Sequence, residues 1–282
     1  MTTIIRLTET TSTSDALRQM ADRGEAPGDF TTVVADFQTS GRGQVGNHWE
    51  SEAGKNLLVS TLVRPRGIDV SRHFTLSMAV SLAVADAVAD ELPPRMRESV
   101  KIKWPNDIYA GHGKLAGILV ENRLSGRHIV ESVIGVGVNV NQERFLSDAP
   151  NPVSIKGIAG RGADLDALLD RYLASLRFRL TMLGEGDEAT ILRHYASRLY
   201  RGDFGFHPFA DASGAFDARI VSVAPDGRLT LERRDGQRRD YLFKEVEHIV
   251  PTTGGKTVTP NLKRGGAAVH IRPLRRSSIG ES

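Results

Sequence analysis

The sequence contains no cysteine, and its eight histidines are scattered along the chain. Without cysteine, neither disulfides nor thiolate metal sites can form. No pair of histidines has the spacing of His-Glu-x-x-His or of another close ligand motif, so no metal ligands are assigned. No apolar stretch approaches about 18 residues, and no charged start is joined to an apolar run, which argues against a membrane span and a signal peptide. A cytoplasmic protein without a membrane partner is expected.

The 282 residues are 40% hydrophobic and 25% charged, as in a folded globular protein. This length predicts one large domain and a smaller one. The net charge of +3 comes from the tail, because residues 251–282 hold six Lys/Arg and one acidic residue, whereas the other 250 residues hold 31 basic and 33 acidic ones. Such a tail is usually a solvated, flexible extension, with nucleic-acid binding as the alternative.

Apolar periodicity and turn residues divide the chain near residues 199–202. The part before this point alternates helical and strand patterns, which predicts an α/β domain over 1–200. Residues 202–250 alternate apolar and polar positions between turns at 212–214, 225–227 and 235–236, which predicts a small all-β barrel over 201–250. The expected helices are 15–24, 71–91, 164–183 and 187–198, and the expected strands are 31–37, 56–63, 101–104, 107–110, 115–121 and 129–135.

A glycine-rich segment, residues 38–49, lies between two of the predicted strands. Gly41, Gly43 and Gly46 match the pattern G-x-G-x-x-G. A dinucleotide-binding loop would open a helix, but a strand follows here, and the downstream motifs of a kinase are missing. A purely structural glycine loop remains an alternative. Glycines let backbone amides approach an anion, and Arg42 adds a fork of donors, so we expect a loop that closes over a negative charge.

Three further segments carry polar groups at strand ends. They are Lys103-Trp-Pro-Asn-Asp107, Lys114-Leu-Ala-Gly-Ile-Leu-Val-Glu121 and Gly135-Val-Gly-Val-Asn-Val-Asn141. Taken singly, each has an ordinary structural explanation, such as a solvated lysine or an Asn-Asp turn beside proline. Gly117, inside a strand, marks a place where another backbone or a ligand can come close.

Together and in this order, the four segments closely resemble the catalytic domain of biotin–protein ligases, also called biotin–acetyl-CoA-carboxylase ligases. The resemblance covers residues 5–250. It implies a class II aminoacyl-tRNA synthetase-like domain, with a mixed sheet and helices on one side, followed by an SH3-like barrel. Some members carry an N-terminal helix-turn-helix and repress transcription. Only 11 residues precede Ser12, so a monofunctional ligase that binds no DNA is expected.

The resemblance implies a two-step reaction. Biotin and ATP give biotinyl-5′-AMP and pyrophosphate, with Mg²⁺ expected on the phosphates, and a lysine of a biotin carboxyl carrier protein domain then takes the biotin. The alternatives are a lipoate or octanoate ligase or transferase of related fold, and a non-catalytic biotin-binding protein. A carrier substrate is excluded because the chain has no Met-Lys-Met hairpin. The oligomeric state stays open, with a homodimer as one option.

Site residues follow from the matching motif positions. Ser12, Thr13, Ser14 and Gln38 would hold the ureido ring, loop 41–44 would close over carboxylate and phosphate, Trp49 would pack near the adenine, and Glu245 would reach the nucleotide or the carrier. The catalytic residues are Arg42, Lys114 and Asp107; the biotin-binding residues are Ser12, Thr13, Ser14, Gln38, Gly41, Arg42, Gly43, Gln44, Lys114 and Gly117; the ATP-binding residues are Arg42, Trp49, Lys103, Asn106, Lys114 and Asn139.

The sequence departs from the family pattern at three positions. Ser14 replaces an asparagine in the segment that would hold the ring. Gln44 and Asn47 replace two arginines of the glycine loop, so Arg42 is the only arginine within 38–49. Because charge-assisted contacts are worth roughly 1.5–3 kcal/mol each, weaker retention of the adenylate is predicted. The retained Arg42 and Lys114 argue against a dead enzyme.

Overall fold

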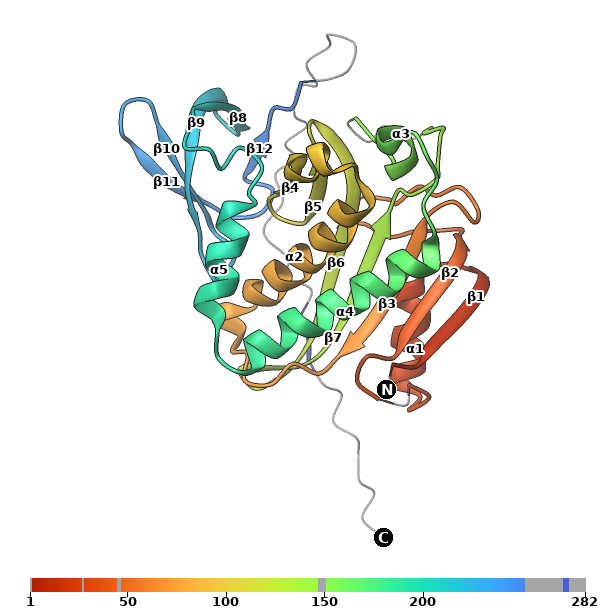
Figure 1. The fold of residues 1–282 in the computed structure, drawn as a ribbon. Coiled ribbons are helices and arrows are strands. Elements are labelled where there is room, and N and C mark those ends of the chain that lie inside the picture. Colours follow the sequence, from red (N-terminus) through yellow and green to blue (C-terminus); the bar gives the residue numbers. More distant parts are fainter. Residues whose placement is uncertain (1, 27, 45–46, 147–150, 252–270, 274–282) are drawn as a thin grey trace.

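The computed structural model describes residues 2–26, 28–44, 47–146, 151–251 and 271–273. Its larger sheet is mixed and has eight strands, seven of them in the order β1-β2-β3-β7-β6-β5-β4 (Figure 1). The eighth, β13, pairs with β6. The pairs β1–β2 and β6–β13 are parallel, and the others are antiparallel. The strands are β1 Ile4–Thr10, β2 Thr32–Gln38, β3 Leu57–Val63, β4 Val100–Lys103, β5 Asp107–Ala110, β6 Gly113–Ser125, β7 His128–Val138 and β13 Ile271–Pro273.

Helices cover both faces of this sheet, so the expectation of helices on one side is wrong. Every residue of β3 is buried, as a strand covered on both faces must be. Helix α1, Thr13–Asp22, packs Leu17 against Leu62 on one face. Helices α2, Phe74–Glu91, and α4, Leu165–Gly184, lie across the other face, and Val59 belongs to their core (Figure 1).

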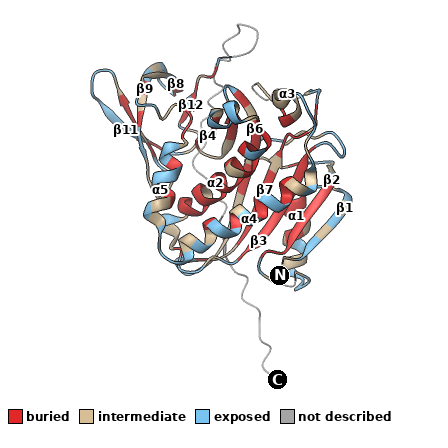
Figure 2. Ribbon diagram, viewed as in Figure 1, coloured by how far each residue is buried: buried red, intermediate tan, exposed pale blue. Residues whose placement is uncertain are grey.

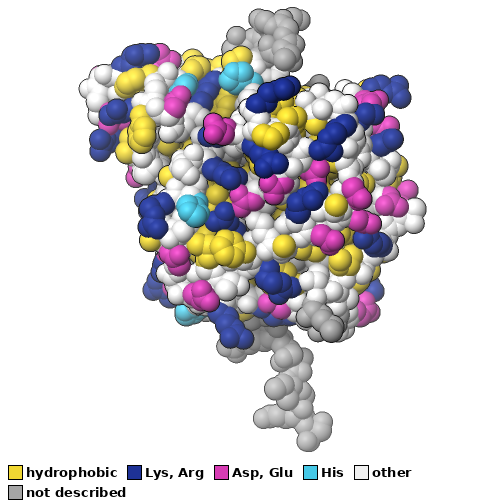
Figure 3. All heavy atoms as spheres, viewed as in Figure 1, with side chains coloured by type: hydrophobic (Ala, Val, Ile, Leu, Met, Phe, Trp, Pro, Cys, Tyr) yellow, Lys and Arg dark blue, Asp and Glu magenta, His cyan; other side chains and the backbone are white. Residues whose placement is uncertain are grey.

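Helix α2 is the centre of the core. It is apolar on nearly all sides and lies between the sheet, α4 and α5, Glu188–Ser197 (Figure 2). A helix that is hydrophobic all round is a buried helix. Of the helices within the described residues, none is long and apolar enough to span a bilayer. The outer face over α2 and α4 mixes basic and acidic side chains (Figure 3). For example, Asp86 pairs with Arg179 at 2.7 Å and with Arg198 at 2.9 Å.

The C-terminal part forms a second, five-stranded antiparallel sheet in the order β11-β10-β9-β8-β12. Its three hairpins confirm the predicted turns. The core of this sheet is continuous with that of the larger one. Trp104 Nε1 donates to the Gly227 carbonyl at 3.0 Å, which joins the Lys-Trp-Pro segment to a hairpin of the second sheet. The strands are β8 His207–Asp211, β9 Gly214–Val223, β10 Leu229–Arg233, β11 Arg238–Tyr241 and β12 Val246–His248.

Most predicted helices and strands are present with small shifts at their ends. Elements not predicted are β1, the short helix α3, Ile155–Ala159, two 3-10 helices, Val70–Arg72 and Pro94–Ser99, and β13. The predicted flexible tail 251–282 falls largely outside the described residues. Three of its residues, β13, pair in parallel with β6 at residues 122–124.

Candidate active site

The motif residues meet on the face of the sheet that α1 covers. From Gly117 onward, odd-numbered residues of β6 point to this face, and three of them mark three stations along the strand: Gly117, Leu119 and Glu121. Gly117 lies opposite Gly137 of β7, and Leu119 lies opposite Gly135. Each station is occupied by side chains from different elements.

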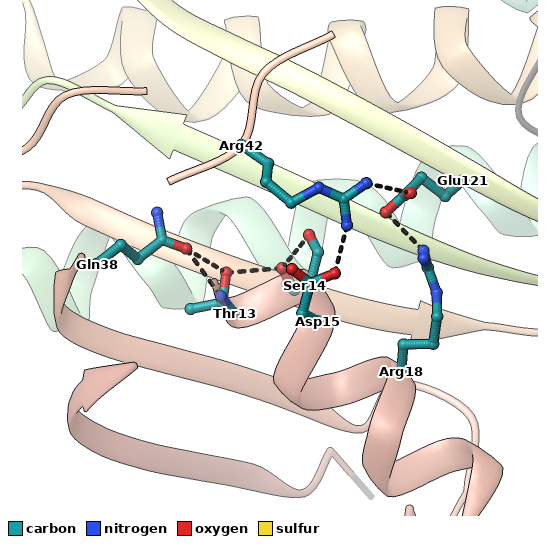
Figure 4. Close-up of polar contacts among 8 residues, drawn as sticks. Thr13, Ser14, Asp15, Arg18, Gln38, Arg42 and Glu121 are labelled. Atoms are coloured by element: carbon teal, nitrogen blue, oxygen red, sulfur yellow. Dashed lines mark hydrogen bonds and ion pairs between the residues drawn. The ribbon is translucent and has the colours of Figure 1, made fainter. Parts of the chain in front are cut away.

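The middle station is a cluster of hydroxyl and amide groups from α1, β2 and β3 (Figure 4). Gln38 Oε1 accepts hydrogen bonds from Thr13 N at 2.8 Å and from Thr13 Oγ1 at 3.1 Å. Ser60 Oγ lies 2.8 Å from Thr13 Oγ1 and 2.9 Å from Ser14 Oγ. A Cβ on Gly135 would lie 2.6 Å from Ser14 Oγ, so glycine makes room for this cluster. Such groups both donate and accept, as recognition of a neutral polar ring requires.

Ser12 is also buried, and it precedes the first turn of α1 without a side-chain capping bond. The sequence therefore predicts three of the side chains that meet here, Thr13, Ser14 and Gln38, but not Ser60. Its only signal is the pair Ser60-Thr61 inside the otherwise apolar run of β3.

The first station, at Gly117, carries Trp49 and an ion pair. Lys114 Nζ lies 2.8 Å from Asp107 Oδ1 and 5.8 Å from the centre of the Trp49 ring. A Cβ on Gly117 would lie 2.9 Å from Trp49 Cζ3, and one on Gly137 would lie 2.6 Å from Trp49 Nε1. The indole therefore rests on two facing glycines that leave it space. Its Nε1 is buried and has no hydrogen-bond partner among the described residues.

The glycine loop forms a small hairpin that carries Trp49 to this place. Trp49 N donates to the Gly41 carbonyl at 2.9 Å, and Gly43 N donates to the Asn47 carbonyl at 3.0 Å. A Cβ on Gly41 would collide with the Trp49 carbonyl. The third glycine of the pattern, Gly46, lies outside the described residues. Because Gly43 N is used within the hairpin, the loop in this conformation presents its arginine rather than that amide.

The third station, at Glu121, is an ionic cluster (Figure 4). Arg42 Nη2 donates to Glu121 at 2.8 Å, Arg42 Nη1 pairs with Asp15 of α1, and Arg18 Nη2 lies 2.6 Å from Glu121. Burial alone would raise the pKa of Glu121, but Arg18 and Arg42 hold that pKa below its ordinary value. Burial alone would lower the pKa of Arg42, but Glu121 and Asp15 raise it above its ordinary value. Sequence reasoning assigned no role to Asp15, Arg18 or Glu121.

The structure does not bring Arg42 and Lys114 together. Glu121 lies four residues beyond Gly117, and a strand rises about 3.3 Å per residue, so the two stations are roughly 13 Å apart. Arg42 Nη2 is bound at the far one. The middle cluster lies between them. The predicted catalytic role of Arg42 beside Lys114 stays a prediction.

Two asparagines that are predicted to bind ATP make hydrogen bonds within the protein. Asn106 Nδ2 donates to the Ile118 carbonyl at 2.5 Å, and the buried Asn139 donates to the Val153 carbonyl at 3.1 Å. Both amides hold backbone segments beside the site. Burial lowers the pKa of Lys103, although Asp107 opposes this. The remaining motif residue, Glu245, is exposed and accepts a hydrogen bond from Leu242 N at 2.8 Å. Its predicted reach to nucleotide or carrier stays a prediction.

A dedicated metal cage is missing from the described residues, which hold no group of three or more His, Cys, Asp or Glu side chains able to bind an ion. Mg²⁺ usually binds through one or two carboxylates together with substrate phosphates and water. Asp107, at the first station, fits that limited role.

The lowered pKa of Glu121 leads to a prediction about stability and pH. A carboxylate with a depressed folded-state pKa contributes fully above its ordinary pKa of 4.5 and loses the contribution as pH falls through the lower folded value. Glu121→Gln should therefore reduce the free energy of unfolding by a constant amount from neutral pH down to about pH 5, and by less below that. Urea unfolding of both proteins across this range measures the difference. A deficit that grows on acidification would contradict it.

Comparison with known proteins gives consistent matches. A model described as the biotin/lipoate A/B protein ligase family matches residues 5–139. A biotin–[acetyl-CoA-carboxylase] ligase of Mycobacterium tuberculosis is 35% identical over 94% of this chain and 87% of that protein. The bifunctional ligase/repressor BirA of Bacillus subtilis is 27% identical over 82% of this chain and 69% of that protein. A solved biotin protein ligase from Aquifex aeolicus, in complex with biotin and ATP, has a TM-score of 0.71 at 24% identity, covering 88% of this chain and 100% of that one.

Proposed function

This chain belongs to the biotin/lipoate A/B protein ligase family, and we propose its function on that basis. Within the family it is a ligase that activates biotin with ATP and attaches it to protein. The observation that carries this assignment is the order of groups along β6. A cluster that suits a neutral polar ring stands next to a lysine–aspartate pair that suits a carboxylate and a phosphate.

The middle cluster favours biotin over lipoate. The ureido ring of biotin has N–H donors and a carbonyl acceptor, whereas the dithiolane ring of lipoate has only sulfur atoms. Thr13, Ser14, Gln38 and Ser60 put four polar side chains at one place, where they bond to one another. They can exchange these bonds for bonds to a ureido ring, whereas an apolar sulfur ring would offer them none. We therefore propose that Ser12, Thr13, Ser14 and Gln38 bind the ureido ring, with Gly117 leaving space along the strand.

In the first step, a carboxylate oxygen of biotin attacks the α-phosphorus of ATP, and the bond to the β-phosphate breaks to release pyrophosphate. We propose that Lys114 offsets the negative charge that gathers on the reacting oxygens, and that Asp107 holds the Lys114 ammonium in place. Trp49 would pack near the adenine, with Lys103, Asn106 and Asn139 around the nucleotide. Mg²⁺ would be held by the phosphates and Asp107, and would offset phosphate charge when bound.

In the second step, the amine of a carrier lysine attacks the acyl carbonyl of the adenylate. The acyl–phosphate bond breaks, AMP leaves, and the nitrogen loses a proton. We propose that Asp107, which is 17% exposed beside Lys114, also positions this incoming amine. A non-catalytic biotin-binding protein is disfavoured because the Lys114–Asp107 pair serves no purpose in holding the ring.

Finer features of the fold are also part of the proposal. Residues 1–200 would be a class II aminoacyl-tRNA synthetase-like domain, which the mixed sheet with its flanking helices supports. Residues 201–250 would be an SH3-like barrel, which the five antiparallel strands support. The acceptor would be a biotin carboxyl carrier protein domain. A cytoplasmic location agrees with the need for ATP, and a homodimer stays open. A ligase without a DNA role is supported by the match, over most of both chains, to a relative named only as a ligase.

Restoring the missing loop arginines should slow the release of the adenylate. Gln44→Arg or Asn47→Arg adds one cation to a loop expected to fold over an anion, and one charge-assisted contact corresponds to a rate change of about tenfold or more. Dissociation of biotinyl-5′-AMP, followed after dilution into unlabelled ligand, measures this. Gln44→Met provides a control of similar size without charge. Equal dissociation rates in Gln44→Arg and the wild type would contradict the prediction.

Transfer of biotin to a carrier domain tests the proposed function. The full chain, ATP, Mg²⁺ and biotin are incubated with a biotin carboxyl carrier domain, and the product is weighed by mass spectrometry. We expect one biotin per domain, and none on a domain whose acceptor lysine is replaced by arginine. A lipoyl domain with lipoate is the matched control. Modification of that domain alone would move the protein to the lipoate branch of the family.

A further inference from the structure

Arg42 is the one arginine of the glycine loop, and its guanidinium makes two ion pairs. They reach in two directions, to Asp15 in the first turn of α1 and to Glu121 on β6 (Figure 4). The fork of a guanidinium suits such a bridge, because its two Nη groups can each serve one carboxylate. The loop is therefore tied to a helix and to a strand through one side chain.

Glu121 is the more rigidly held of the two carboxylates that bind Arg42. Its side chain is only 5% exposed, it stands on a central strand, and Arg18 binds its other oxygen. Asp15 is the less rigidly held carboxylate, because its side chain is 35% exposed. The two arginines balance the two carboxylates, so the cluster has no net charge to offer to a substrate anion. Its place, roughly 13 Å along β6 from the Lys114 station, also separates it from the reacting groups.

The position of Trp49 depends on the two ion pairs of Arg42. Arg42 faces His48 across the hairpin, and Gly41 accepts a hydrogen bond from Trp49 N. Fixing Arg42 therefore fixes the hairpin that lays the indole on Gly117 and Gly137, beside Lys114.

We propose that Asp15, Glu121 and Arg18 are positioning residues that hold Arg42, and through it hold Trp49 beside Lys114. Arg42 then acts as the anchor of the loop rather than as a cation at the reacting oxygens. The inference deepens the proposed function and rests on it for its kinetic consequence only. Asp15 also has an ordinary role, since an acidic residue in the first turn stabilises a helix. That role alone would not move the loop.

The first test observes the loop without any assay of activity. Trypsin needs a free arginine side chain, so cleavage after Arg42 reports how often the anchor opens. We expect Glu121→Gln to raise the rate of this cut about tenfold and Asp15→Asn to raise it about threefold, because the carboxylate is buried in the first pair and half-buried in the second. Asp22→Asn is the matched control, because Asp22 lies on the same helix as Asp15 and its ion pair goes to Arg123 of β6 instead of to Arg42. It should leave the cut at Arg42 unchanged.

Fluorescence gives an independent reading. The chain has two tryptophans, and Trp104 is buried and bonded to Gly227. A red shift in Glu121→Gln or Asp15→Asn therefore reports Trp49 leaving its glycines, while thermal unfolding shows that each variant is folded. Wild-type emission together with a wild-type rate of cleavage in both variants would overturn the proposal that Arg42 anchors the loop.

The kinetic test separates anchoring from catalysis. If the loop only positions Trp49, Glu121→Gln should raise the KM for ATP about tenfold and change kcat of biotin-dependent pyrophosphate exchange by less than about twofold. A fall in kcat with an unchanged KM would overturn the proposal, because it would place Arg42 at the reacting atoms. If the wild type shows no biotin-dependent exchange, the proposed function fails, and cleavage and fluorescence still decide whether the loop is anchored.

Discussion

Replacing Lys114 with methionine should lower kcat for biotin-dependent ATP–pyrophosphate exchange by about a thousandfold, with little change in the binding of biotin. Lys114 is the cation at the first station, at Gly117, paired with Asp107 and next to Trp49. Negative charge on the carboxylate and phosphate oxygens must be offset as they meet, and a fixed charge in a partly buried site does this far better than water. Methionine keeps most of the length and removes the charge.

The control for this prediction is Lys101→Met. Lys101 stands on β4, opposite Tyr109 of β5 and away from the three stations, so exchange should stay near the wild-type rate. Calorimetry with biotin alone separates binding from chemistry. If Lys114→Met raised the biotin dissociation constant strongly and left kcat intact, Lys114 would be a binding residue and the assignment of its catalytic role would be wrong.

Gly137→Ala should lower kcat/KM for the same exchange by about a hundredfold. The added methyl group would occupy the space of the Trp49 indole, so the ring would have to leave its place over β6 and β7. The hairpin that carries the ring would move with it. A misplacement of about 1 Å near reacting groups can cost a hundredfold in rate.

Gly184→Ala, at the end of α4, is the matched control, because a Cβ there meets nothing within 4 Å. Both variants should unfold at similar temperatures, since the indole is displaced toward solvent rather than into the core. A Gly137→Ala enzyme with wild-type kcat/KM would show that the position of Trp49 over the glycines has no part in the reaction.

The sequence predicted the regular elements well where the hydrophobic period was long. Helix α2 and strand β3 are apolar over most of their length, and both were found within a few residues of their observed ends. Strand β1 was missed because it is an edge strand whose residues are exposed or half-buried and include two threonines, a glutamate and an arginine. Helices on both faces were missed because the pattern of α1 does not say which face it covers.

In the candidate site, residues that belong to local motifs were predicted, and contacts that depend on tertiary packing were not. Lys114, Asp107, Gly117 and Trp49 were named from motifs, and the register of β5 and β6 brings the first three together. The ion pairs of Arg42 with residues far away in the chain were not foreseen. Asp15 and Glu121 are separated by more than a hundred residues, and only the packing of α1 on the sheet lets Arg42 bridge them. No local signal carries that information.

The central claim is that this chain makes an acyl adenylate from biotin, and isotope exchange between pyrophosphate and ATP tests it most directly. The wild-type chain is supplied with Mg²⁺ and ATP, and with biotin, lipoate or neither. We predict exchange that depends on biotin and is absent with lipoate. Exchange with lipoate alone would contradict the choice of substrate. No exchange with either acid, despite measurable binding of biotin, would contradict the enzyme itself and leave a binding protein on a ligase scaffold.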